Sequence, residues 1–316
     1  MARTAVVALG GNAIIRAGQA GTSQEQTTNA RTMAAAVTSL RADGWRVVLV
    51  HGNGPQVGNI AIQQEEAAHR VPELPLFWQN AMTVGQLGSL ITLALRGAGA
   101  TDVAALVTHV LVDPQDPAFG RPTKPIGPFM TEEEARQHAA QRGWTVGEDA
   151  GRGWRRIVPS PVPIGIVELE AVRSLVAQDL VVIAGGGGGL PVVTDVDGWS
   201  GLDAVVDKDL TAQVLANALD ADALVLVTDV ERVMLDFGTP GARPVDRMTV
   251  AEAEQHAADG QFPPGSMGPK MNAAVRFVRG GGRTAVITNA TLAAATLAGR
   301  ADAGTCVVSD ARIGAA

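Results

Sequence analysis

The sequence has no tyrosine, a single cysteine and few aromatic residues. The lone Cys306 excludes an intramolecular disulfide and is typical of a reducing compartment, and its apolar surroundings predict a buried strand position. No apolar run is long enough to cross a bilayer, and no leader-like segment precedes the apolar stretch Ala5–Leu9. A net charge of −7 and a pI near 5.3 leave no basic face for nucleic acid. We therefore expect a soluble, cytoplasmic protein with no nucleic-acid or membrane partner.

Lysine is also scarce. The chain has 25 lysine and arginine residues, and the lysines among them are Lys124, Lys208 and Lys270. A lysine ammonium is a compact, mobile charge, which suits phosphate oxygens in motion better than a rigid guanidinium does. The alternative is compositional drift that has left a few accidental lysines.

Two of these lysines occur where helices are expected to start. Leu210, Val214 and Ala218 recur at helical spacing, so a helix should begin near Lys208. Lys270 lies in the first turn of another expected helix. Both charges oppose the helix dipole unless an anion lies in front of the unpaired N–H groups. The pattern therefore indicates an anion-binding site.

Short apolar runs alternate with helical patterns along the chain. We expect buried strands at Ala5–Leu9, Val47–Val50, Ala104–Val112, Leu180–Ala184, Leu224–Thr228, Arg283–Ile287 and Thr305–Val308. The helix after the first strand is expected to open with a capping box formed by Ser23 and Gln26. This alternation predicts an α/β fold in which helices cover both faces of a mostly parallel open sheet.

Glycine-rich or polar turns follow several of these strands. They are Gly10–Gly11–Asn12, Gly52–Asn53–Gly54, Gly185–Gly189 and Thr228–Asp229. Parallel strands end at a common edge of the sheet, where ligands bind. Glycine lets backbone N–H groups approach a phosphate, although it also follows strands for purely steric reasons. The spacing matches neither the dinucleotide-binding fingerprint nor the P-loop.

The segment at about 113–163 differs in composition, being rich in proline, glycine and arginine. We expect it to form a small subdomain that protrudes from the main sheet. Its one clear helix should run from Thr131 to Arg142, with a capping box between Thr131 and Glu134. Lys124 lies here among stiffening prolines, and the alternative is an ordinary solvated loop lysine. The histidines and carboxylates show no spacing typical of a metal site.

Several stretches together resemble the carbamate kinase branch of the amino acid kinase family. They are Ala8–Ala13 (ALGGNA), His51–Gly58 (HGNGPQVG), Pro117–Pro128 (PAFGRPTKPIGP), Val206–Leu210 (VDKDL) and Gly265–Lys270 (GSMGPK). Most amino acid kinases have a lysine two residues before the first glycine pair, where this chain has Ala8. In the carbamate kinase branch a lysine of the protruding subdomain takes that role, and Lys124 matches it. Met130 stands where that branch is expected to have tyrosine.

The resemblance implies a three-layer αβα sandwich, a homodimer, and reversible phosphoryl transfer between ATP and carbamate, giving ADP and carbamoyl phosphate. It also implies Mg²⁺ with ATP or ADP, and a role in arginine metabolism that includes ATP synthesis from carbamoyl phosphate. Residues 1–200 would bind carbamate and the phosphoryl group, and residues 201–316 would form the nucleotide-binding lobe. The alternatives are a kinase of another small carboxylate or phosphate, and a non-catalytic relative that binds a nucleotide or an oxyanion.

The motifs also assign the site residues. Lys124, Lys208 and Lys270 are the expected catalytic lysines, which Asp209 would orient unless it serves only as a helix cap. The residues expected to cradle carbamate and the phosphoryl group are Gly10, Gly11, Asn12, Gly52, Asn53 and Gly54. The residues expected to bind the nucleotide are Gly185, Gly186, Thr228, Asp229, Met267 and Gly268. No protein metal ligand is assigned, because magnesium would be held mainly by water and phosphate oxygens.

Overall fold

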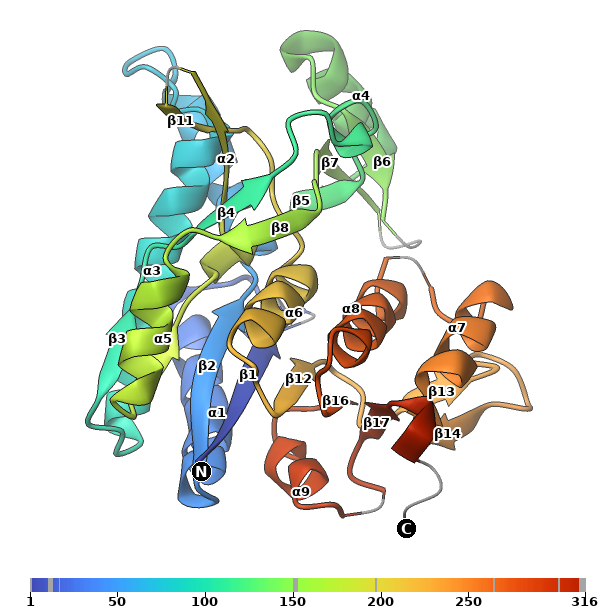
Figure 1. The fold of residues 1–316 in the computed structure, drawn as a ribbon. Helices are drawn as coiled ribbons and strands as arrows, with labels where there is room; N and C mark the ends of the chain where they lie inside the picture. Colours follow the sequence, from blue (N-terminus) through green and yellow to red (C-terminus); the bar gives the residue numbers. More distant parts are fainter. Residues whose placement is uncertain are drawn as a thin grey trace.

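The computed structural model describes residues 2–10, 14–16, 18–149, 153–196, 198–263, 265–300 and 302–312. Gly11 and Asn12, two of the expected substrate-binding residues, lie outside the described residues. Figure 1 shows a central sheet with helices packed on it, and a second group of smaller sheets above it.

The central sheet contains the apolar runs that were expected to form buried strands, except for the second half of the run at 104–112. Its strand order is β15 (Arg247–Thr249), β17 (Thr305–Val308), β16 (Thr284–Thr288), β12 (Ala223–Val227), β1 (Arg3–Leu9), β2 (Trp45–His51), β9 (Val181–Ile183) and β3 (Val103–Ala105). Among these strands, β16 and β17 pair antiparallel and the other neighbours pair parallel. The prediction of a mostly parallel sheet is confirmed.

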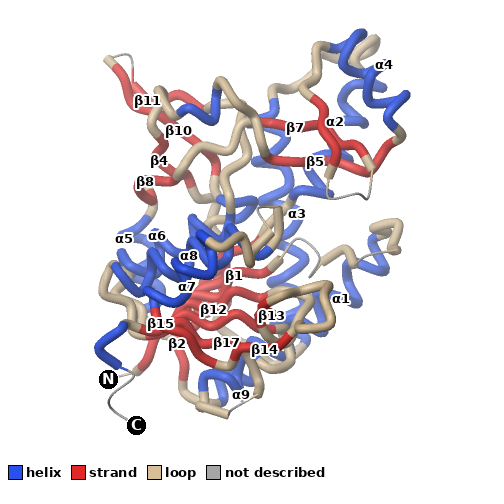
Figure 2. The backbone as a smooth tube through the Cα atoms, turned by 90° about the vertical axis from the view of Figure 1, so that its right-hand side faces the viewer, coloured by secondary structure: helices blue, strands red, loops and turns tan. Residues whose placement is uncertain are grey.

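Helices cover both faces of this sheet and complete the predicted αβα arrangement (Figure 2). One face carries α5 (Leu169–Ala177), α6 (Lys208–Ala218), α7 (Val250–Ala258) and α8 (Met267–Arg279). The other face carries α1 (Ser23–Ala42), α3 (Leu76–Gly97) and α9 (Ala293–Leu297). Each layer buries its own hydrophobic cluster against the sheet, so strands buried on both faces are continuous apolar runs rather than alternating ones.

The smaller sheets lie beyond the central one. One has the order β11 (Gly198–Gly201), β10 (Leu190–Asp195), β4 (His109–Val112) and β8 (Pro163–Ile166), and another has the order β5 (Lys124–Met130), β7 (Trp154–Val158) and β6 (Val146–Glu148). We refer to β5, β6, β7 and α4 (Glu132–Arg142) as the subdomain, and β5 contacts α2 (Gly54–Ala67). The remaining short elements are the β13 (Val233–Leu235) and β14 (Arg243–Val245) hairpin and the 3₁₀ turns η2 (Pro117–Phe119), η3 (Gly186–Gly188) and η4 (Asp310–Arg312).

The start of α1 differs from the prediction by one residue. Thr22 and Glu25 form the capping box, in which each side chain bonds the backbone N–H of the other residue. The expected pair, Ser23 and Gln26, is wrong because Gln26 is turned into the protein, where its amide donates to the Gly21 carbonyl. The box expected in α4 is confirmed, with Thr131 capping the N–H of Glu134.

The single strand expected at 104–112 is wrong, because the chain changes sheets within it. β3 ends at Ala105 and pairs with β9, whereas β4 begins at His109 and pairs with β10 and β8. Leu106 still donates its N–H to the Ile183 carbonyl, and Thr108 already accepts from the Leu190 N–H. A continuous apolar run does not reveal this crossing, since the residues on both sides of it are suited to a strand.

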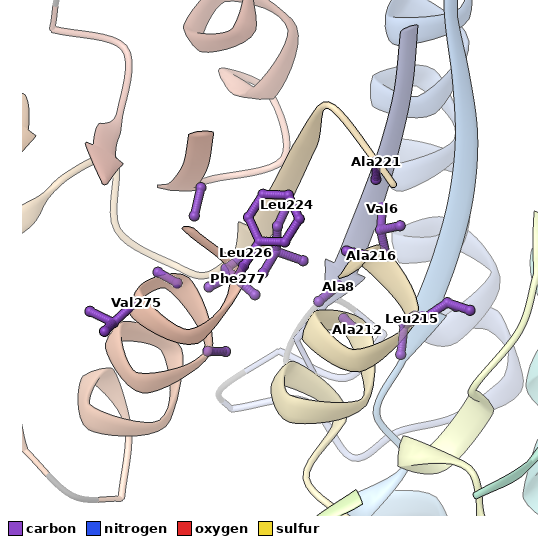
Figure 3. Packing of buried hydrophobic residues seen from close by; sticks show 14 of the residues in the cluster. Val6, Ala8, Ala212, Leu215, Ala216, Ala221, Leu224, Leu226, Val275 and Phe277 are labelled. Atoms are coloured by element: carbon purple, nitrogen blue, oxygen red, sulfur yellow. The ribbon is translucent and has the colours of Figure 1, made fainter. Parts of the chain in front are cut away.

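Helix α6 approaches β1 closely because the side chains between them are small. Figure 3 shows Ala212 and Ala216 of α6 beside Val6 and Ala8 of β1, and all four side chains are fully buried. Such close packing fixes the position of α6 on the sheet. Across the described parts of the chain, no helix combines enough length and apolar character to span a membrane.

Candidate active site

The strand order places the expected ligand-binding turns side by side. β12, β1, β2 and β9 are consecutive and parallel. The residues that follow them, Thr228, Gly10, Gly52 and Gly185, therefore lie along one edge of the sheet. The prediction of a shared edge is confirmed.

Lys208 and Lys270 meet at one buried carboxylate beside this edge. Lys208 Nζ donates to Asp209 Oδ1 at 2.6 Å, and Lys270 Nζ donates to Asp209 Oδ2 at 3.2 Å. The Asp209 side chain is only 3% exposed. Because α6 and α8 are neighbours in the same layer, their first turns bring the two ammonium groups to the same carboxylate.

Lys124 reaches the same cluster from the subdomain. It is the first residue of β5, and its Nζ donates to Asp207 Oδ2 at 2.6 Å. Asp207 is the N-cap of α6, and its Oδ1 accepts the Asp209 N–H at 2.9 Å. The structure thus brings the three lysines of the chain together, alternating with two carboxylates, and leaves the cluster one net positive charge. Lys124 is half-buried rather than a solvated loop residue.

Burial and pairing shift the pKa values within this cluster. Burial lowers the pKa of Lys208, although the charge of Asp209 opposes that shift, and the nearby Lys270 adds to it. Burial also acts to lower the pKa of Lys270, but the charge and hydrogen bond of Asp209 outweigh it, so that pKa is raised. Burial acts to raise the pKa of Asp207, but Lys124 and Lys208 hold it well below the usual range. The carboxylate of Asp207 therefore stays ionised at neutral pH.

The turn after β2 presents the N-terminus of α2 to the same edge. Asn53 is the N-cap residue, yet its side chain makes no capping hydrogen bond to the described residues of α2. Its Nδ2 donates instead to Asn80 Oδ1 and, at 2.6 Å, to Thr83 Oγ1, both in α3. Asn53 therefore leaves the first N–H groups of α2 to other partners, and such groups favour an anion.

The Gly185–Gly189 turn is buried between these parts of the site. A Cβ atom on Gly187 would lie 2.6 Å from Asn53 Nδ2, and one on Gly188 would lie 2.1 Å from the Val206 carbonyl oxygen. Both residues also have positive φ angles, 67° and 85°. Glycine alone tolerates both constraints. The turn therefore lies between Asn53 and the segment that leads into α6, and it sets the distance between them.

Gly185 and Gly186 contact protein atoms in the same way. A Cβ atom on Gly186 would lie 2.6 Å from His51 Nε2, and one on Gly185 would lie 3.0 Å from Thr211 Cγ2. Burial lowers the pKa of His51 to about 4, so its ring is neutral at neutral pH. These two glycines lie in the wall of the site, packed against the end of β2 and the first turns of α6.

Close packing holds β5 on α2. A Cβ atom on Gly58 of α2 would lie 1.8 Å from Gly127 Cα of β5, so the two backbones touch. Glu65 of α2 pairs with Arg142 and, at 3.7 Å, with Arg156 of the subdomain. The Glu65 side chain is only 7% exposed. The subdomain is therefore anchored to α2 by a backbone contact with β5 and by the pairing of Glu65 with arginines of α4 and β7.

A cavity of about 490 Å³ opens at the same edge, on the α1 side of the sheet. Gly10, Thr228 and Asp229 line it together with Asn29 and Asn289. The lysines lie on the α6 and α8 side instead, and the charge of Asp229 contributes to raising the pKa of Lys270. The remaining expected nucleotide ligands, Met267 and Gly268, form the first turn of α8 before Lys270.

The sequence does not single out Asp207, Asn80 or Thr83. Asp207 is one of several carboxylates with no distinctive spacing in the sequence, and its pairing with Lys124 depends on contact between segments 83 residues apart. Asn80 and Thr83 are fully buried one turn apart in an apolar helix. Polar residues on the buried side of an amphipathic helix are a signal that identifies such positions, because they need hydrogen-bond partners.

Known proteins share this sequence and geometry. The amino acid kinase family matches residues 3–289. Carbamate kinase of Pyrococcus horikoshii is 43% identical over 95% of this chain and 98% of its own, and carbamate kinase 2 of Enterococcus faecalis is 44% identical over 90% and 93%. A solved structure, carbamate kinase from Giardia lamblia bound to AMP-PNP, has a TM-score of 0.88 at 39% identity and covers 98% of this chain and 99% of that one. The chain therefore belongs to the amino acid kinase family, and within it to the carbamate kinase branch.

Proposed function

We propose that this chain is an enzyme that transfers a phosphoryl group reversibly between ATP and carbamate, giving ADP and carbamoyl phosphate. The observation that carries the proposal is the cluster of Lys124, Asp207, Lys208, Asp209 and Lys270 at the sheet edge that bears the glycine turns. The names of relatives at 43% and 44% identity support carbamate as the acceptor.

Phosphoryl transfer requires in-line alignment of the reacting oxygens and positive charge around the phosphoryl group. In our proposal Lys208 and Lys270 neutralise the β and γ phosphates, and Asp209 orients both ammonium groups. Lys124 approaches the transferring group from the subdomain. Ala8 is fully buried beneath α6, so the first strand offers no ammonium group at that position. The attacking carbamate oxygen is already anionic, and the reaction therefore needs no general base.

The two substrates would occupy different parts of the edge. Gly10, with the neighbouring Gly11 and Asn12, and the Gly52–Gly54 turn would hold carbamate and the phosphoryl group, supported by the N-terminus of α2, which the Asn53 side chain does not cap. The nucleotide would lie on the lobe formed by residues 201–316, near Thr228–Asp229 and Met267–Gly268. We assign Gly185 and Gly186 to the wall that supports both parts, because they are buried against protein atoms.

Magnesium would enter with the nucleotide. Within the described residues, no group of three or more histidine, cysteine, aspartate or glutamate side chains could hold a metal ion. A magnesium ion held mainly by phosphate oxygens and water needs no such group, and this is the usual arrangement for nucleotide-bound magnesium. When bound, the ion would neutralise phosphate oxygens that the lysines do not reach.

We also propose that the chain forms a homodimer through α3. Trp78, Met82 and Leu93 are exposed on this helix, and their spacing places them on one side of it. Large apolar side chains gathered on one face are typical of a subunit interface, and a second copy would bury them symmetrically. Sedimentation analysis tests this: we expect a dimer for the native chain and a monomer for Leu93→Glu.

The decisive assay is ATP formation from ADP and carbamoyl phosphate, with magnesium present or chelated. We expect magnesium-dependent ATP formation that Lys124→Arg, Lys208→Arg and Lys270→Arg each reduce, since arginine keeps the charge but changes its shape. Near-native turnover in all three variants would refute the requirement for a compact ammonium group. Nucleotide binding without turnover would identify a non-catalytic member of the family. Faster ATP formation from acetyl phosphate than from carbamoyl phosphate would show that the phosphoryl acceptor in the ATP-consuming direction is another small carboxylate.

A further inference from the structure

Asp207 is the one carboxylate in the cluster that contacts both the subdomain and the start of α6. Its Oδ2 accepts from Lys124 Nζ at 2.6 Å, and its Oδ1 accepts the Asp209 N–H at 2.9 Å. Both oxygens therefore have fixed partners. The side chain is 17% exposed, so water competes weakly with these contacts.

The capping bond fixes where this carboxylate lies. Asp207 caps α6 from an extended backbone conformation (φ −71°, ψ 121°), and α6 is itself packed on β1 through alanines. Asp207 therefore belongs to the rigid part of the protein. Lys124 begins β5, whose backbone touches α2 and whose Ile126 packs in a buried cluster that includes Val205. The segment before α6 has another contact on this side, because the Val205 N–H donates to the Pro159 carbonyl. The Lys124–Asp207 ion pair is the contact that acts on the Lys124 ammonium itself.

We propose that Asp207 is a positioning residue, which aims the Lys124 ammonium at the phosphoryl site and ties the subdomain to the N-terminus of α6. The part of this inference that concerns catalysis rests on the proposed function. Asp207 itself does not contact the phosphoryl group. It supplies a fixed acceptor for one of the three N–H bonds of Lys124 and leaves the others for an anion.

The scarcity of lysine makes this inference directly testable without any substrate. Besides the terminal amine, an amine-acylating reagent has only Lys124, Lys208 and Lys270 to react with, and peptide mass mapping separates them. We compare the native chain with Asp207→Asn and Asp207→Ser. Both replacements are good N-cap residues, so α6 keeps its cap while Lys124 loses its ionic partner. Asp179→Asn is the matched control, because it removes a carboxylate from an exposed pair with Arg41.

We expect Lys124 to be acylated roughly three to ten times faster in both Asp207 variants, the range expected when a partly exposed, hydrogen-bonded ion pair is lost. Lys208 and Lys270 should change much less than Lys124, because Asp207 acts on them through its charge alone and their hydrogen-bond partner Asp209 is retained. The control should match the native chain. Equal Lys124 rates in the native chain and both variants would overturn the proposal. Because no substrate is present, this result does not depend on whether the chain is a carbamate kinase.

Kinetics then test the catalytic part. In Asp207→Asn we expect kcat to fall about tenfold while KM for ADP stays near the native value, since Lys208 and Lys270 keep their contacts. A structural role limited to capping would leave kcat unchanged, because asparagine preserves the cap. Faster acylation of Lys124 with an unchanged kcat would therefore overturn the positioning role. Absence of ATP formation in the native chain would instead refute the proposed function.

Discussion

Replacing Asp209 by asparagine tests how much the buried Asp209 carboxylate stabilises the folded chain by pairing with Lys208 and Lys270. The native Asp209 side chain is only 3% exposed and accepts hydrogen bonds from Lys208 and Lys270. Asparagine keeps the shape and one acceptor oxygen but removes the charge. Two buried ammonium groups then share no counter-charge at that position. Breaking a buried ion pair on one side costs about 3–5 kcal/mol, and we expect a value near the lower end because the acceptor oxygen remains.

The pH dependence of this loss follows from the pKa of Lys208. Burial already lowers that pKa, and Asp209 is the strongest opposing influence. Without Asp209 the pKa of Lys208 falls further in the folded state, while the unfolded value stays at about 10.4. Between the two values the unfolded chain binds more protons, so folding stability rises with pH. The deficit of Asp209→Asn should therefore be largest near neutral pH and shrink as the pH approaches 10.

Urea unfolding at pH 7 and pH 9.5 measures this difference. Asp179→Asn serves as the control, because its pair with Arg41 is exposed and is worth at most about 1 kcal/mol at either pH. In the ATP-formation assay at pH 7 we expect Asp209→Asn to lower kcat by about 10²–10³, a typical loss for a charge-stabilising group. If Asp209→Asn is no less stable than the control, or its deficit does not shrink at high pH, the buried-charge argument is wrong.

Three other substitutions probe the surroundings of the site. His51→Asn should make the free energy of unfolding less sensitive to acid. The pKa of His51 is about 4 in the folded chain and about 6.5 in the unfolded chain, so the native chain should lose about 2 kcal/mol of stability between pH 7.5 and 5. Urea unfolding at both pH values should show this loss in the native chain and not in the variant. Gly58→Ala should cost about 1–3 kcal/mol by thermal unfolding and also lower kcat, because its Cβ meets the backbone of Gly127 rather than a movable side chain. Glu65→Gln should cost about 2 kcal/mol and speed amide hydrogen exchange in β5 to β7, because Arg156 loses a buried partner; unchanged exchange would contradict the anchoring role.

Local pattern was sufficient to predict the layers of the fold. Continuous apolar runs such as Val47–Val50 identify strands buried on both faces, and helical spacing after Lys208 identifies α6. Both signals depend on residues close together in the chain. Where the local signal was ambiguous the prediction failed, as at the change of sheet between Ala105 and His109.

The sequence by itself determined that the chain would form an αβα sandwich with glycine turns after its strands, and that Lys208 and Lys270 would stand at helix starts, where an anion is favoured. Tertiary structure alone decided that Lys124 pairs with Asp207, that Lys270 reaches Asp209, and that Asn53 bonds α3 instead of capping α2. These contacts join segments far apart in the chain, and their partners are set by strand order and helix packing rather than by any local preference.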